Sequence, residues 1–316
     1  MAAAAPIVEL NQASKAFGGT VAVDRLSLAV APGQVFGLIG PSGCGKTTTI
    51  RLLLGVLRPT SGSVAVMGSD PTHFSTRQRE QIGYTPQGFF LYPTLTVYEN
   101  MRFVAGLFGM GWWRRRTRIR QVLEFLELWE VRRRLARHLS GGMQRRLELA
   151  CALVHEPTVI FVDEPTAGLD PVLRGKIWDL LRTLRDQGVT VFVTTQYIDE
   201  IEHCDNVGIL DRGRLVAIGT PESLRRKAIG GEVVEVEARD VSREAVMALR
   251  QLPAVRSIRW TDVGLRVVVE DAATATPAIT ETLQDRGQVV EAVRPVVASF
   301  DDVFKRIVGG EEQGHG

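Results

Sequence analysis

A glycine-rich segment near the start of the chain has residue types suited to binding phosphate. It reads GPSGCGKT over residues 40–47, follows an apolar run and precedes a stretch of helical spacing, which is the context that this pattern requires. Glycines let backbone N–H groups approach phosphate oxygens, and a helix N-terminus adds positive potential. Lys46 is expected to neutralise β/γ-phosphate charge, and the Thr47 hydroxyl to ligate Mg²⁺. The expected nucleotide contacts in this phosphate loop are Gly40, Pro41, Ser42, Gly43, Cys44, Gly45, Lys46, Thr47 and Thr48.

Two adjacent carboxylates follow a second apolar run. The run at residues 159–162 has the length of a strand, and Asp163 and Glu164 come directly after it. Ligands of open α/β sheets bind at the carboxyl ends of strands, so Asp163 is placed to hold Mg²⁺ directly or through water. Glu164 could then act as general base on the attacking water. Alone, such a pair is as often a helix cap as a metal site, but together with the phosphate loop it indicates hydrolysis.

A third segment, LSGGMQ at residues 139–144, supplies a second turn able to hold a γ-phosphate. With the other two motifs in this order and at these separations, it resembles the signature of the ATP-binding subunits of ABC transporters. The resemblance covers about residues 7–225. It implies that this segment contacts the ATP of a partner subunit through Ser140, Gly141, Gly142, Met143 and Gln144.

Other marks of the family can be placed on single residues. Phe17, in KAFG, resembles the aromatic side chain that stacks on adenine, although taken alone it is more typical of a core residue. Gln87, in IGYTPQ, matches the glutamine that reaches Mg²⁺ or the attacking water and reports nucleotide occupancy to a helical insertion. Gly168, Leu169 and Asp170 resemble the loop that crosses the dimer interface.

One position departs from the family pattern. The usual histidine that contacts the γ-phosphate is replaced by Gln196, in TTQY. An amide can donate a hydrogen bond to phosphate but carries no titrating charge, so we expect Gln196 to act in its place in a slow enzyme. The run at 195–200, an extra C-terminal unit and the tail SFDDVF at 299–304 resemble a narrower group, the daunorubicin-resistance-type exporter ATPases, which commonly have this glutamine.

The strands and helices that must position these residues indicate an α/β fold. Strands are expected at 7–10, 21–30, 35–39, 159–162 and 189–194, with helices from 46 to about 54 and from 171 to 185. The fold class is therefore α/β, and the resemblance implies a P-loop NTPase of the ABC type within a nucleotide-binding domain at residues 1–230. A helical insertion at about 90–145 interrupts it, since Ile119, Val122, Leu123 and Leu126 have helical spacing.

Arginine is concentrated in the helical insertion. Residues 112–146 contain eleven Arg and three Glu. The simplest interpretation is a solvated helix face, and the alternative is a basic surface that faces phosphates or a partner chain. Trp112 and Trp113 are expected to anchor packing.

The C-terminal region, residues 231–316, is expected to form a separate α+β domain. Residues 230–231 are a glycine pair that suits a joint, and the segments from 232 to 293 follow the order β-α-β-β-α-β. That order is typical of a ferredoxin-like accessory or regulatory unit. Ser299 is suited to cap a final helix.

Composition limits the setting. The net charge of the 316-residue chain is +2, which gives no reason to expect a nucleic-acid partner. The three cysteines, Cys44, Cys151 and Cys204, are odd in number and far apart, as in proteins of the reducing cytosol. The start lacks the features of a signal peptide, and no run has the roughly 18 to 20 apolar residues that cross a bilayer.

These observations predict an ATP-binding and ATP-hydrolysing subunit that uses Mg²⁺ at the cytoplasmic face of a cell membrane. The resemblance implies a partner ATPase subunit, a second copy or a similar chain, and a separate integral membrane permease that exports a hydrophobic or amphiphilic compound of the drug or antibiotic type. The first alternative is an importer ATPase with a ligand-sensing C-terminal unit, in which Trp260 could line a pocket, although packing in the core is the simpler place for it.

Two further alternatives leave transport out. DNA-repair ATPases of this type carry a long coiled coil and translation ATPases carry two nucleotide domains, and the sequence shows neither. A nucleotide-binding switch without turnover is disfavoured because both Asp163 and Glu164 are present. The cargo, its direction and the role of the C-terminal unit are left open.

Overall fold

The structure, a computed structural model, describes residues 5–238 and 240–312 and divides into two compact units, Met1–Ile218 and Gly219–Gly316. The sequence placed the joint at residues 230–231. In the structure the second unit begins before helix α7 (Pro221–Ile229), because α7 packs against the last helix, α10 (Phe300–Glu312).

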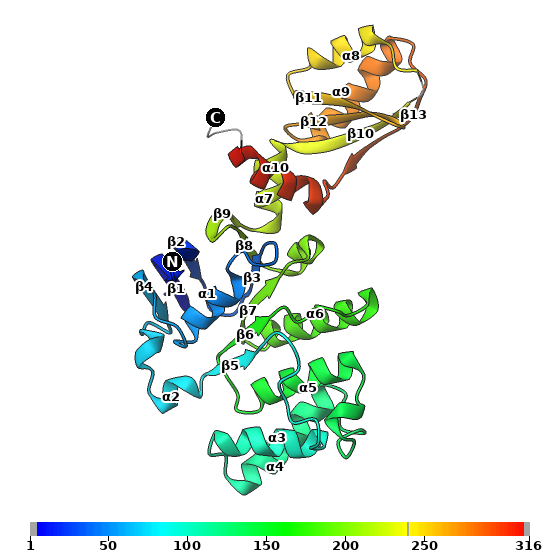
Figure 1. Ribbon diagram of the computed structural model, residues 1–316. Helices are drawn as coiled ribbons and strands as arrows, with labels where there is room; N and C mark the ends of the chain where they lie inside the picture. Colours follow the sequence, from blue (N-terminus) through cyan, green and yellow to red (C-terminus); the bar gives the residue numbers. More distant parts are fainter. Residues whose placement is uncertain (1–4, 239, 313–316) are drawn as a thin grey trace. The chain divides into compact units, whose positions relative to one another are not determined.

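The central sheet of the first unit has six strands in the order β5-β6-β7-β3-β8-β9 (Figure 1). These strands are β3 (Val35–Ile39), β5 (Ile82–Thr85), β6 (Val159–Asp163), β7 (Thr190–Thr195), β8 (Asn206–Asp211) and β9 (Arg214–Gly219). Strands β3, β6 and β7 are buried along their whole length, which explains their continuous apolar runs. Parallel pairing sets Ile39 beside Thr195 and Asp163 beside Thr194, so the segments that follow these strands start from one edge of the sheet.

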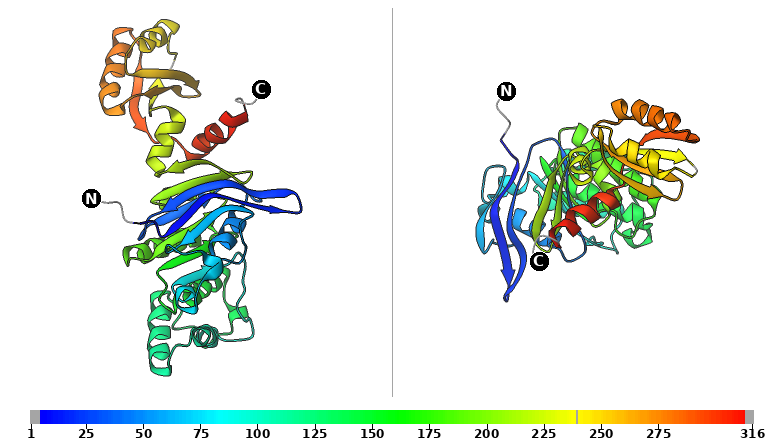
Figure 2. Two further views of the ribbon diagram at one scale, coloured as in Figure 1. Left: turned by 90° about the vertical axis from the view of Figure 1, so that its left-hand side faces the viewer. Right: turned by 90° about the horizontal axis from the view of Figure 1, so that it is seen from above.

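A second, antiparallel sheet has the order β2-β1-β4. Its strands are β1 (Val8–Phe17), β2 (Thr20–Val30) and β4 (Ser61–Val66), and β1 and β2 form a long two-stranded ribbon (Figure 2). The turn between them is Gly18 and Gly19, both with positive φ. Leu10 and Leu26 of this sheet share one apolar core with Phe36 and Phe161 of the central sheet.

The helices of the first unit follow the expected order, with small changes at their ends. They are α1 (Lys46–Leu53), α2 (Thr76–Arg79), α3 (Val97–Leu107), α4 (Trp112–Phe125), α5 (Gly141–Leu153) and α6 (Pro171–Asp186), with short 3₁₀ turns at Pro71–His73, Ala136–His138 and Ile198–His203. Thr96 caps α3 through a reciprocal capping box with Glu99, which fixes where the helical insertion begins.

The helical insertion packs α3, α4 and α5 against one another. Ile119, Val122 and Leu123 are buried, as their spacing predicted. The expectation that Trp112 and Trp113 anchor packing was wrong. Their exposed fractions are 54% and 77%, and the two rings contact each other edge to face at the start of α4, because they precede the buried stripe of that helix.

The second unit contains a four-stranded antiparallel sheet in the order β11-β12-β10-β13 (Figure 1). Its strands are β10 (Glu232–Ala238), β11 (Val255–Thr261), β12 (Gly264–Val269) and β13 (Val290–Val296), and its helices α8 (Arg243–Arg250) and α9 (Ala272–Asp285) complete the ferredoxin-like order that the sequence predicted. One face of the sheet packs on α8 and α9 through residues such as Val234, Val236 and Val267.

Three details of this unit differ from or extend the sequence reading. Helix α9 begins at Ala272 and contains Pro277, and Asp271 caps it by accepting a hydrogen bond from the Thr274 N–H. Trp260, for which core packing was the simpler expectation, is 58% exposed because it lies on the edge strand β11. Ser299 precedes α10 and its Oγ accepts from the Asp302 N–H, as expected for a cap.

Candidate active site

Two glycines of the phosphate loop are required by close contacts. A Cβ on Gly40 would lie 2.1 Å from the Leu210 carbonyl oxygen, and a Cβ on Gly45 would lie 2.4 Å from the Ala22 carbonyl oxygen. Gly45 also has a φ of 111°, which L side chains rarely adopt, and directly precedes α1. The loop therefore turns tightly from β3 into α1, with neighbouring backbone on both sides.

Lys46 lies at the start of α1 and is buried, with 4% of its surface exposed. Its Nζ donates to the carbonyl oxygens of Gly40 and Pro41, at 2.8 and 3.0 Å, and lies 3.3 Å from Glu164 Oε1. The phosphate-loop lysine and the predicted general base are thus brought together from motifs far apart in the sequence. Thr47 and Thr48 follow on α1 and are half-buried.

Glu164 also contacts the third predicted element of the site. The Gln87 Nε2 donates to Glu164 Oε2 at 2.8 Å, so the carboxylate interacts with Lys46 on one oxygen and with Gln87 on the other. Glu164 has a φ of 47°, a left-handed conformation that costs a residue with a side chain roughly 1–3 kcal/mol. Its N–H donates to the carbonyl and hydroxyl oxygens of Thr194, both at 3.1 Å, which holds this conformation.

Asp163 is completely buried at the end of β6. Its Oδ1 accepts a hydrogen bond from the Thr194 hydroxyl at 2.5 Å. Its Oδ2 is also buried and has no hydrogen-bond partner among the described residues. A buried carboxylate oxygen without a donor is costly, and a cation is one way to satisfy it.

Sequence reasoning missed Arg145, which was counted only among the arginines of the helical insertion. This side chain is 7% exposed and donates to four backbone carbonyls, those of Pro86, Asp163, Glu164 and Pro165, at 2.8–3.0 Å. It therefore joins the loop that carries Gln87 to the loop that carries the two carboxylates. Its place on α5, directly after the LSGGMQ segment, was a signal that could have drawn attention to it.

Glu148 completes this link. The Arg145 Nη1 lies 2.6 Å from Glu148 Oε2, and Glu148 Oε1 accepts from the Phe90 N–H at 3.2 Å. Burial raises the pKa of Glu148, and the hydrogen bond from Arg145 opposes this effect. Thr194, which orients both Asp163 and Glu164, was likewise assigned no role from the sequence.

The LSGGMQ segment forms the N-terminus of α5. Ser140 caps this helix, its Oγ accepting from the Met143 N–H at 3.4 Å, and Gly141 is exposed. Gly142 is buried, and a Cβ at this position would lie 3.0 Å from Leu173 of α6. Gln144 donates to the Ala136 carbonyl oxygen. In the described ranges no hydrogen bond joins Ser140 to the phosphate loop of the same chain.

The remaining predicted residues lie at the surface. Gly168 and Asp170 are exposed, and Asp170 caps α6 by accepting from the Val172 and Leu173 N–H groups, while Leu169 is half-buried. Phe17, at the end of β1, is 47% exposed with the Lys15 ammonium 5.2 Å from its ring centroid. It is therefore not a core residue.

Gln196 directly follows β7 and is exposed. It comes two residues after Thr194, which contacts both carboxylates. Cys44, Cys151 and Cys204 are buried free thiols, in agreement with the expectation that they form no disulfide framework.

A parallel sheet with a phosphate loop after one strand, and an Asp-Glu pair after its neighbour but one, defines a P-loop nucleoside triphosphatase. The comparisons specify the family. The ABC transporter model matches residues 23–167, and a model described as ATP-binding protein DrrA1-3-like, C-terminal domain, matches residues 219–308. The chain belongs to the ABC transporter ATP-binding family, whose members are ATPases coupled to transport, and it is of the DrrA-like type.

Three curated relatives illustrate the match. The Nod factor export ATP-binding protein I of Paraburkholderia xenovorans is 37% identical over 309 residues, 97% of this chain and 98% of that protein. The daunorubicin resistance ATP-binding protein DrrA2 of Streptomyces coeruleorubidus is 36% identical over 306 residues, 96% of this chain and 95% of that protein. The probable multidrug ABC transporter ATP-binding protein YbhF of Escherichia coli is 40% identical over 226 residues, but the match spans only 39% of its length.

Solved structures agree on the fold of the first unit. cbiO1 from Clostridium perfringens, described as part of the ABC transporter complex cbiONQ, is 28% identical with a TM-score of 0.65, covering 72% of this chain and 94% of that chain. The ATP-binding cassette MJ0796, solved as a dimer in a post-hydrolysis state bound to ADP and Pi, is 29% identical with a TM-score of 0.61, covering 67% of this chain and 98% of that chain. Across the described part of the present chain, none of the helices combines the length and the apolar character needed to traverse a bilayer.

Proposed function

We propose that this chain is the ATP-hydrolysing subunit of an exporter, and that it drives a hydrophobic or amphiphilic compound of the drug or antibiotic type through a separate integral membrane permease. The names of relatives matched along nearly their whole length, a Nod factor export protein and a daunorubicin resistance protein, support this proposal. The match of residues 219–308 to a DrrA-like C-terminal domain supports the exporter over the importer alternative.

The observation that carries the catalytic part is the convergence of Lys46 and Gln87 on the two oxygens of Glu164. In this proposal Glu164 is the general base that accepts a proton from the attacking water, and Gln87 positions that carboxylate and the water. Lys46 neutralises the charge of the transferred phosphoryl group. Gln196, exposed after β7, donates an amide hydrogen bond to the γ-phosphate.

Mg²⁺ is the expected metal, and the residues present fit it. The buried, unpartnered Oδ2 of Asp163 is an anionic oxygen of the kind that Mg²⁺ prefers. Asp163, Thr47 and Gln87 would hold the ion together with the phosphate oxygens. When bound, it would supply positive charge to the β- and γ-phosphates.

A second nucleotide-binding subunit, a second copy or a similar chain, completes the site in this proposal. Ser140 and the residues up to Gln144 would close on the ATP held by the other subunit's phosphate loop, with residues 168–170 at the interface and Phe17 stacked on adenine. The dimeric form of a related cassette supports this arrangement.

Coupling to transport follows from differential affinity. ATP favours the closed pair of subunits because its γ-phosphate charge is neutralised from both sides, and hydrolysis removes that preference. The chain would work at the cytoplasmic face of the cell membrane, held there by the permease.

The test uses a candidate permease, sought among the membrane proteins encoded near this gene. Both chains are produced together, and ATP-dependent accumulation of a fluorescent amphiphile is measured in inside-out and right-side-out vesicles, with Lys46→Ala as the inactive control. Export predicts accumulation only in inside-out vesicles. Accumulation only in right-side-out vesicles would establish the importer alternative, and ATP-independent accumulation would exclude both.

A further inference from the structure

The face of the C-terminal sheet that α8 and α9 leave uncovered carries a row of charges, and α10 lies over part of it. Helices α8 and α9 cover the other face through Val234, Val236 and their neighbours. On the charged face the register sets Arg259 of β11 opposite Arg266 of β12, Arg266 opposite Glu235 of β10, and Glu235 opposite Arg294 of β13. Three cations and one anion therefore cross the four strands. Like charges directly opposite each other destabilise an antiparallel pair, and Arg259 and Arg266 form such a pair.

The surrounding carboxylates, which include Glu237 beside Arg294, pair with Arg266 and Arg294. Glu235 lies 3.7 Å from Arg294 and 3.9 Å from Arg266, and Asp302 of α10 lies 3.4 Å from Arg266. Arg259 makes no ion pair within the described residues. The Arg266 Nε is buried there without an acceptor. The Arg266 side chain as a whole is 42% exposed, so its outer guanidinium nitrogens are open to a ligand.

A cavity of about 210 Å³ lies over this row, between the sheet and α10. Four cationic side chains and one carboxylate line it, with an apolar floor. They are Arg259, Arg266, Lys305, Arg306 and Asp302, over Ile229, Val233, Val268 and Ala298. Arg306 donates to the carbonyl oxygens of Ala228 and Ile229, which fixes α10 against the end of α7.

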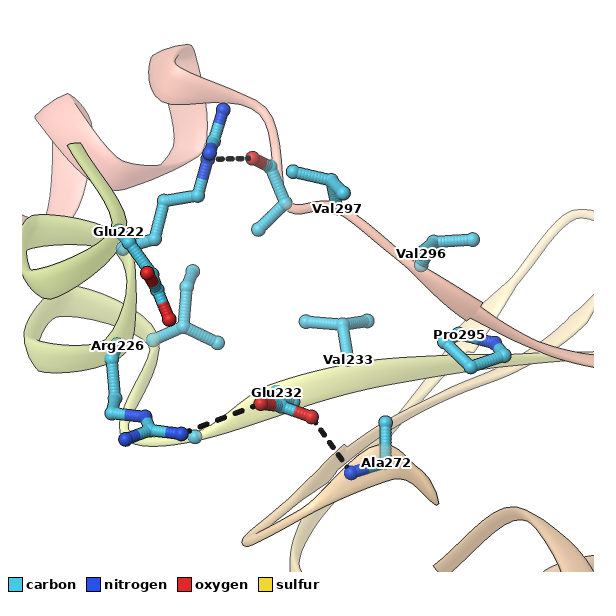
Figure 3. A pocket seen from close by; sticks show the side chains of 12 residues that line it. Glu222, Arg226, Glu232, Val233, Ala272, Pro295, Val296 and Val297 are labelled. Carbon is cyan, nitrogen blue, oxygen red and sulfur yellow. Dashed lines mark hydrogen bonds and ion pairs between the residues drawn. The ribbon is translucent and has the colours of Figure 1, made fainter. Parts of the chain in front are cut away.

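The next row on the same face is apolar and leads into a second cavity. Val268 lies opposite Val233, and Val233 opposite Val296, and the first two are 5% exposed. The second cavity, of about 260 Å³, shares Ile229, Val233 and Ala298 with the first. Figure 3 shows Val233 and Val296 among the side chains that line this second cavity. Charged groups that line the second cavity bind neighbouring residues, as in the Arg226–Glu232 ion pair and the hydrogen bond from the Ala272 N–H to Glu232.

We propose that this face binds an amphiphilic anion. An oxyanion head, a carboxylate or a phosphate, lies between Arg259 and Arg266, and Lys305 and Arg306 add positive charge. The apolar part lies along Val268 and Val233 toward the second cavity. Guanidinium groups bind such heads through two parallel hydrogen bonds, and the Arg259 guanidinium, which lines the cavity, makes no competing ion pair within the described residues. Binding joins α10 to β11 and β12, so it stabilises the C-terminal unit whether or not ATP is bound.

The experiment uses the full chain, with calorimetry and thermal unfolding, and compares ligands of one chain length below their micellar concentrations. Decanoate and monodecyl phosphate carry the two possible heads, while decanol, decyltrimethylammonium and inorganic phosphate each lack one required feature. We expect both anionic amphiphiles to bind and to raise the Tm, and the tighter of the two identifies the source as a fatty carboxylate or a phosphorylated lipid.

Substitutions locate the site. Arg259→Gln and Arg266→Gln should each weaken binding by about tenfold or more, because each removes a charge-assisted hydrogen bond. Arg250→Gln, an exposed arginine at the end of α8 and off this face, should leave affinity unchanged. Without ligand, Arg259→Gln should be no less stable than the natural chain, since it relieves the Arg259–Arg266 repulsion, which separates lost binding from lost folding.

Three results would overturn the proposal. They are equal binding of decanol or decyltrimethylammonium, equal affinity for inorganic phosphate and monodecyl phosphate, and unchanged affinity in both arginine variants. None of these readouts depends on ATP hydrolysis, so failure here is distinct from failure of the exporter assignment.

Discussion

The Lys46 ammonium lies 3.3 Å from a carboxylate oxygen of Glu164, and only 4% and 9% of these side chains are exposed. An ammonium group has three donors, and Lys46 uses two of them on the carbonyl oxygens of Gly40 and Pro41. A nucleotide phosphate that reaches this lysine must therefore compete with Glu164. The same contact ties the state of the general base to the occupancy of the phosphate loop.

Glu164→Gln tests both halves of this relationship. We expect turnover to fall by about 100-fold or more, because the general base is lost. ATP should bind at least as tightly, because an amide competes less well than a carboxylate for Lys46, and MgATP should trap a dimer visible by size-exclusion chromatography. Lys46→Ala serves as the control that loses nucleotide binding. Turnover equal to that of the natural chain would remove Glu164 from its proposed role.

Arg145→Met tests the link between the two catalytic loops. The substitution leaves Glu148 buried without its partner and removes the donor to four carbonyl oxygens, so we expect a loss of about 3–5 kcal/mol in the free energy of unfolding. Urea denaturation measures it. Arg120→Met is the matched control, since its partner Glu124 is exposed and little change is expected. Equal stability of the two variants would contradict the proposal that Arg145 links the two catalytic loops.

Gln196 is tested by two replacements. We expect Gln196→Ala to lower the ATPase rate by removing the only side-chain amide proposed for the γ-phosphate, and Gln196→His to retain or raise it, because imidazole can donate to phosphate. Steady-state phosphate release measures both rates at saturating MgATP. An alanine variant as fast as the natural chain would show that Gln196 takes no part in turnover.

The burial of Glu200 leads us to predict that the stability of the chain depends on pH. This residue is 2% exposed, and burial raises its pKa above the ordinary value of 4.5. A carboxyl group with a higher pKa in the folded chain binds more protons when folded, so its effect on stability becomes unfavourable as pH rises from 4.5 through the raised pKa. Glu200→Gln should thus be more stable than the natural chain at neutral pH.

The measurement for Glu200 is urea unfolding of both chains from acid to neutral pH. The stability difference between them should grow in favour of the variant as the pH rises and become independent of pH below the unfolded pKa. A difference that is independent of pH would show that Glu200 is not the titrating group. Glu202→Gln, an acidic neighbour that is exposed, provides the control for a change of net charge.

Much of the candidate site was predictable because its motifs are contiguous. The GPSGCGKT loop, the acidic pair after an apolar run and the LSGGMQ segment each depend on residues within one turn and its flanking element. Backbone sterics and helix-end electrostatics act over such short spans, so residue type and spacing were enough to assign Lys46, Asp163 and Glu164. The β-α-β-β-α-β order of the C-terminal unit could be predicted from the sequence for the same reason.

Contacts between distant segments were decided only by the tertiary structure. The parallel register of β6 and β7 places Thr194 against Asp163 and Glu164, and packing of α5 brings Arg145 to the carbonyls after β6. The Arg259–Arg266 pair likewise arises from the register of two strands rather than from any local pattern. Side-chain exposure, as at Trp112, depends on which neighbouring elements cover a surface, and periodicity within one helix carries no information about those neighbours.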